Sequence, residues 1–91
     1  MGAMNAADIA KILFRHDPVG LAPAGMPQDE YMFEAETISD RLPSAESVDD
    51  VQRILHEEFI TWFTVETAGD LSVYRGAALE IHAAMSSQAT I

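Results

Sequence analysis

The sequence predicts an all-α protein: a single small domain of about four short helices in an irregular bundle. Apolar residues recur three and four positions apart along most of the chain, and prolines and glycines separate these segments. The one segment that could be extended, Phe63 to Val65, has no obvious partner strand. With 91 residues, 48% of them apolar and 22% charged, the chain can bury one modest core and is too hydrophobic for an intrinsically disordered protein.

The expected domain covers residues 4–88. Residues 1–3 resemble a remnant of cloning, which leaves Met4 as the expected native start. The N-terminus lacks the basic and apolar regions of a secretory signal, and no apolar run is long enough to span a bilayer. The chain has no cysteine, which excludes disulfides and thiolate chemistry. We therefore expect a cytoplasmic protein.

The first helix is expected from Asn5, a suitable N-cap, to about His16. The turn 17–20, Asp-Pro-Val-Gly, ends it, because proline disfavours helical geometry in the preceding residue and glycine permits a turn. The residues expected on its buried side are Ile9, Ile12 and Leu13.

The second helix is expected to begin at Pro27, run to about Leu42 and end at Pro43. The acidic residues Asp29 and Glu30 suit its positive first turn. Apolar residues spaced i, i+4, i+7 and i+11 define its core face: Tyr31, Ala35, Ile38 and Leu42.

The third helix is expected from the N-cap Ser47, with Asp50 at the N3 position as in a weak capping box, to about Phe63. Its expected buried residues are Val48, Val51, Leu55, Phe59 and Trp62. Ile60 lies off this face, where either a place at an interface or packing against the last helix would explain it equally well.

The turn 68–70, Ala-Gly-Asp, precedes a fourth helix capped by Asp70 or Ser72. Gly76 weakens this helix by up to ~1 kcal/mol relative to alanine, and the polar tail from Ser86 is expected to fray. One face of the helix carries Leu71, Tyr74, Ala78, Ile81 and Met85.

The residues that could carry chemistry are too scattered to predict an enzyme. The three histidines, His16, His56 and His82, fall on different expected helices, and no Glu-x-x-His pair is present. Glu30 and Glu34 share a helix face, and we expect both to be solvated. No Gly-x-Ser-x-Gly elbow and no phosphate-binding glycine loop occurs. We predict no catalytic residue, no metal site and no cofactor.

Net charge is the strongest functional signal, with fifteen Asp and Glu against five Lys and Arg, a formal −10. Residues 29–58 hold ten of these acids and only two arginines, which gives −8 of the −10. Such a surface repels nucleic acids and anionic membranes and attracts basic proteins. We therefore predict a basic protein partner, with no direct nucleic-acid binding and no membrane binding.

An aromatic residue interrupts the acidic side of the second helix. Asp29, Phe33, Glu36 and Asp40 recur at +4, +7 and +11, almost opposite the core face. Either a neighbouring segment (the loop before Pro27 or the C-terminal segment) covers Phe33, or Phe33 anchors a partner within a rim of charges. The candidate partner-binding residues are Asp29, Glu30, Phe33, Glu36, Asp40, Asp50 and Glu57.

A pattern in the first half of the chain resembles small bacterial helical proteins. It consists of residues 16–21 (His-Asp-Pro-Val-Gly-Leu), residues 27–31 (Pro-Gln-Asp-Glu-Tyr), and then Glu34 and Ile38. Some of these proteins resemble immunity proteins of contact-dependent growth inhibition. The resemblance covers about residues 9–63, with Met32 where an acid is usual, and the C-terminal third matches no motif.

The resemblance implies a stoichiometric inhibitor of a toxin, many of which are basic nucleases. It also marks Asp17, Pro18, Gly20 and Tyr31 as a motif turn with a structural or a binding role. Two other hypotheses stay open. One is a phage-type inhibitor, anti-CRISPR or anti-restriction, whose carboxylates mimic a nucleic-acid backbone. The other is a minor enzyme or ligand-binding domain that uses a pocket near His16, Asp17, Asp29 and Tyr31.

Overall fold

The computed structural model describes residues 5–16 and 31–89, with side chains up to Ser86. Within these ranges every regular element is helical, which confirms the predicted all-α fold. None of the helices in these ranges has the length and hydropathy needed to cross a membrane. The elements are α1 (Ala6–His16), α2 (Met32–Arg41), η3 (Leu42–Ser44), α3 (Val48–Trp62), α4 (Val65–Ala68), η4 (Leu71–Tyr74) and α5 (Arg75–Ala89).

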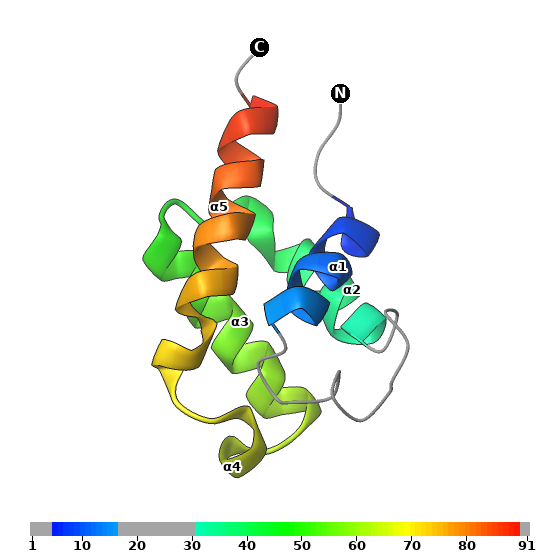
Figure 1. The fold of residues 1–91 in the computed structure, drawn as a ribbon, viewed down its shortest axis with the longest axis vertical. Helices are drawn as coiled ribbons and strands as arrows, with labels where there is room; N and C mark the ends of the chain where they lie inside the picture. The colour runs from blue at the N-terminus through cyan, green and yellow to red at the C-terminus, as the bar shows by residue number, and fades with distance from the viewer. Residues whose placement is uncertain (1–4, 17–30, 90–91) are drawn as a thin grey trace.

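The four longer helices enclose one core. Helix α1 packs against α2 and α5, and α3 packs against α5 and α2. In Figure 1, α5 (orange to red) crosses α3 (green), while α1 (blue) lies over α2 (cyan). Apolar residues of the four helices and of the short segments beside them are therefore buried together, among them Ile9, Leu13, Tyr31, Ala35, Ile38, Leu42, Val51, Leu55, Phe59, Tyr74, Ala78 and Ile81.

Aromatic rings gather around Phe59 in this core. Its ring centroid lies 5.7 Å from that of Tyr31, 5.2 Å from that of Tyr74 and 5.7 Å from that of Phe63. Tilted and offset arrangements at these separations are favourable for aromatic pairs. Phe59 thus joins α3 to the start of α2 and to the start of α5.

The start of α3 is capped as the sequence predicts. The Ser47 hydroxyl accepts a hydrogen bond from the Asp50 amide at 3.2 Å. The Asp50 carboxylate reaches back and accepts the Glu46 amide at 2.8 Å. Two amides without helical partners are thereby satisfied, and Asp50 completes a variant of the capping box.

The connection from α3 to α5 is helical instead of extended. Thr64 caps the short helix α4 by accepting the Thr67 amide at 3.0 Å, so the segment from Phe63 to Val65 forms no strand. Gly69 then takes a φ of +78°, a conformation that favours glycine, in the predicted turn. Asp70 caps η4 through the Ser72 amide at 3.1 Å.

Several expected boundaries and buried positions differ from the structure. The turn at 17–20 and the expected helix start at Pro27 lie outside the described residues. Helix α2 ends at Arg41, and Pro43 lies within a 3₁₀ turn. Helix α5 continues past Ser86 to Ala89.

Two residues assigned to the core from helical periodicity are exposed. Trp62 is 43% exposed, and so is Leu71. Both lie at the ends of their elements, where the facing helices no longer cover them. Periodicity indicates the side of a helix that faces the core but not where the core ends.

Candidate protein-binding face

The outer face of α2 carries an exposed aromatic ring between carboxylates. Phe33 is 67% exposed. Glu36 and Asp40 follow it three and seven residues later and are exposed as well. Helical geometry places all three on one side of α2. The described residues leave the ring exposed, and of the two segments expected as a possible cover, the loop before Pro27 lies outside the described residues.

Phe33 stacks against Trp62, the last residue of α3. The ring centroids are 6.3 Å apart and the planes meet at 26°. The indole Nε1 of Trp62 donates a hydrogen bond to the Thr37 hydroxyl at 3.2 Å, and that hydroxyl donates to the Glu34 carbonyl at 3.0 Å. We call Phe33, Thr37 and Trp62 the aromatic shelf. The sequence pattern missed Trp62 as a site residue because its periodicity assigned it to the core.

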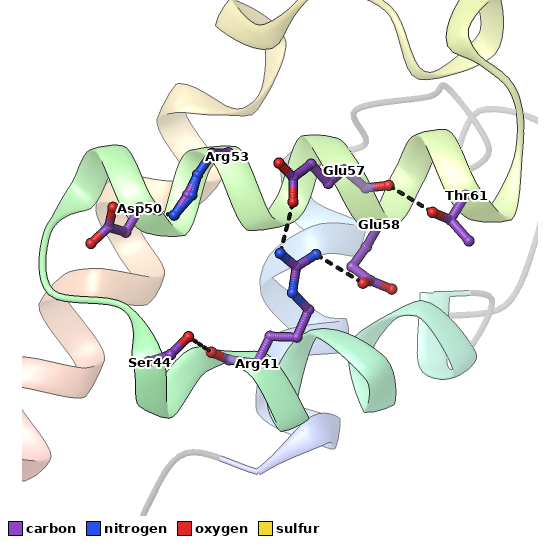
Figure 2. Close-up of polar contacts among 7 residues, drawn as sticks. All are labelled: Arg41, Ser44, Asp50, Arg53, Glu57, Glu58 and Thr61. Carbon is purple, nitrogen blue, oxygen red and sulfur yellow. Dashed lines mark hydrogen bonds and ion pairs between the residues drawn. The ribbon is translucent and has the colours of Figure 1, made fainter.

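One turn beyond the shelf, Arg41 joins α2 to α3. Its guanidinium donates to Glu57 at 2.7 Å and to Glu58 at 3.0 Å, as Figure 2 shows. The hydrogen bond to Glu57 is the largest cause that raises the pKa of Arg41 above its usual value. The charges of Glu57 and Glu58 are thus engaged within the chain.

The carboxylates on this side of the molecule fall into two groups. Asp50 accepts the Glu46 amide and lies 3.4 Å from the Arg53 guanidinium, so its charge, like that of Glu57, is already engaged. Glu36 and Asp40 form no hydrogen bond or ion pair with any other residue that the structure describes. Among the four described candidate carboxylates (Glu36, Asp40, Asp50 and Glu57), the two beside Phe33 are therefore the ones without an ion pair in the described chain.

The remaining candidate residues lie either outside the described residues or on the buried side of the molecule. Asp17, Pro18, Gly20, Asp29 and Glu30 lie outside the described residues. Tyr31 is fully buried against Phe59, so in the described part of the motif it has a structural role. Glu34 is only 6% exposed, and the expectation that it is solvated is wrong. It lies one turn from both Tyr31 and Ile38, on the buried side of α2.

Two of the three histidines contact other described residues of the chain. His16 Nε2 lies 2.9 Å from a Glu80 oxygen, and His56 Nε2 lies 2.9 Å from the Gly69 carbonyl oxygen. In the parts of the chain that the structure describes, no three histidines or carboxylates are grouped as metal ligands. The described members of the hypothetical pocket, His16 and Tyr31, have different surroundings, because His16 contacts Glu80 and Tyr31 lies in the aromatic core.

Comparison with known protein families, with curated proteins and with solved structures finds no match to this chain.

Proposed function

We propose that this chain is a non-catalytic acidic protein that binds and inhibits a basic protein partner through the outer face of α2. The observation that carries the proposal is the exposed Phe33 ring beside Glu36 and Asp40, two carboxylates with no ion-pair partner among the described residues. Aromatic anchors supply binding energy at interfaces, and rim charges guide the approach of an oppositely charged partner.

Inhibition follows from the charge of such a partner. A protein that binds nucleic acid presents lysines and arginines to phosphates. When carboxylates of this chain bind those lysines and arginines, they exclude the phosphates. The net charge of −10 also accelerates the encounter of the chain with its basic partner. A toxin nuclease, blocked by an immunity protein, is the form of partner that the Asp-Pro-Val-Gly resemblance favours.

Charge reversal on α2 tests the proposal. Immobilised wild-type chain, Glu36→Lys, Asp40→Lys and the double variant are exposed to a lysate of the cells that carry the gene, at low and at high salt. Glu46→Lys is the matched control, because it makes the same charge change as each single variant at an exposed residue off α2.

We expect a basic protein that the wild type and Glu46→Lys retain at low salt and that the double variant releases. The purified partner then loses activity on nucleic acid when the wild-type chain is added, and keeps it when the double variant is added. Equal retention by the double variant, or retention of no basic protein by the wild type, would show that this face is not the binding surface.

A further inference from the structure

The aromatic shelf is the main apolar feature of the acidic face. Phe33 and Trp62 come from different helices, and both are exposed although they stack on each other. A pair of rings left open to water retains a large apolar area that a partner can cover, because aromatic side chains bury about 150–250 Å² each when enclosed. The exposed area of these two rings therefore favours a ligand that covers them.

The shelf is held in place before any partner binds. The only hydrogen-bond donor of the indole is occupied by Thr37, and Thr37 is tied to its own helix through the Glu34 carbonyl. A ring fixed in this way loses little conformational freedom on binding, which lowers the cost of association. With its N–H engaged, the indole offers a partner its ring face and edge.

The negative charge of the neighbouring carboxylates favours a cationic group as the ligand of that ring face. Glu36 lies one turn after Phe33 and Asp40 two turns after it, and neither is neutralised by a described residue. A guanidinium stacks flat on an aromatic ring and binds a carboxylate through two parallel hydrogen bonds. An ammonium has the same charge but lacks this planar fork.

The arginine nearest along the same side of α2 does not fill the shelf. Arg41 is one turn beyond Thr37, and its guanidinium is held by Glu57 and Glu58. A second copy of the chain is a poor occupant, because two surfaces that each belong to a molecule of charge −10 repel each other.

We propose that the aromatic shelf is the binding site for an arginine side chain of the basic partner. The guanidinium stacks on the rings and forms an ion pair with Glu36 or Asp40. This inference rests on the proposed function and specifies the chemistry of the partner residue at its contact surface.

Trp62 is the only tryptophan in the chain, so its fluorescence reports on the shelf directly. The probes are two synthetic peptides of equal length and charge, one of alternating glycine and arginine and the other of alternating glycine and lysine. We expect the arginine peptide to change the emission of Trp62 and to bind the wild type about two- to fivefold more tightly than the lysine peptide.

Variants assign that preference to the shelf. Phe33→Leu keeps an apolar side chain but removes one of the two rings, and we expect it to reduce the preference for the arginine peptide. Leu79→Ala is the control, because it truncates a 49% exposed apolar residue on α5 and leaves the shelf intact. Because Phe33 is exposed, both variants should melt within a few degrees of the wild type.

The outcomes separate this inference from the proposed function. If both peptides bind the wild type equally, and Glu36→Lys with Asp40→Lys weakens the binding of both, the acidic face is still the binding surface but the proposed arginine site is wrong. If neither peptide binds, or if the double variant binds them as the wild type does, the proposed function itself fails. Concentration-dependent Trp62 emission without peptide, together with a dimeric mass, would show that a second copy covers the shelf and would overturn the inference.

Discussion

The indole of Trp62 at the end of α3 is tied to Thr37 on α2 by a hydrogen bond of 3.2 Å between Nε1 and Oγ1. This bond links two helices at the surface and holds the Trp62 ring against Phe33. An exposed indole N–H can exchange such a bond for one to water, so the bond orients the ring more than it stabilises the fold.

Replacement of Thr37 by valine should release the Trp62 ring. Valine has nearly the shape and helix propensity of threonine but no hydroxyl, so Thr37→Val removes the acceptor of the indole N–H together with the hydrogen bond to the Glu34 carbonyl. We expect the near-ultraviolet circular dichroism of Trp62 to decrease, with a loss of about 0.5–1 kcal/mol in the free energy of unfolding. Thr61→Val is the control, because the Thr61 hydroxyl donates to the Glu57 carbonyl of its own helix. An unchanged tryptophan signal in Thr37→Val would mean that the bond does not orient the ring.

Arg41→Met should destabilise the contact between α2 and α3. The substitution keeps most of the apolar stem and leaves Glu57 and Glu58 without their counter-charge. We expect the free energy of unfolding, measured by urea denaturation, to fall by about 1 kcal/mol at low salt and by less at high salt.

A double-mutant cycle of Arg41→Met with Glu58→Gln isolates this interaction, because Glu58 is the less exposed of the two carboxylates. Arg53→Met is the comparison, since its pair with Asp50 joins residues of one helix at 3.4 Å. If Arg41→Met costs no more than Arg53→Met, the bridge between the helices contributes nothing beyond an ordinary surface pair.

Helical periodicity was enough to predict most of the fold. Tyr31, Ala35, Ile38 and Leu42 all lie in the core, as their spacing predicts, because a helix with one covered side must bury that side. The same spacing assigned Trp62 to the core, wrongly, because it contains no information on where the neighbouring helix ends.

The candidate site was predictable in part. Periodicity places Phe33, Glu36 and Asp40 opposite the core face, and the structure shows all three exposed. The contacts of Arg41 with Glu57 and Glu58 depend on how closely α2 approaches α3, a tertiary property that the spacing of charges within one helix does not encode. Sequence alone could therefore not separate the engaged carboxylates from the available ones.

Tyr74 should make stability depend on pH in the alkaline range. Its hydroxyl donates to the Ala68 carbonyl at 2.5 Å, and burial raises its pKa from 10.0 to about 12. The folded state therefore holds this proton more tightly than the unfolded state, so its contribution is complete below pH 10 and is lost as the pH rises to about 12. We expect the free energy of unfolding to fall more steeply over this interval in the wild type than in Tyr74→Phe.

At neutral pH, Tyr74→Phe should cost about 1 kcal/mol, because the Ala68 carbonyl loses its donor. Denaturant unfolding of both proteins at several pH values gives the two quantities together. Parallel pH profiles of wild type and variant would contradict the raised pKa of Tyr74.

The close packing of α1 against α5 should limit the stability that is gained when alanine replaces Gly76. A Cβ at this position would lie 3.2 Å from both Cε1 and Nδ1 of His16, closer than ordinary contact, and His16 is also paired with Glu80. In a helix, alanine is favoured over glycine by up to ~1 kcal/mol. We expect Gly76→Ala to gain less than this in the wild type, because the His16 ring must move. In a His16→Ala background the gain should be larger by about 0.5 kcal/mol.

Thermal and urea unfolding of the two single variants and the double variant measure the difference. Equal gains in both backgrounds would show that the His16 ring moves without cost, and that Gly76 is not required for close packing of the two helices.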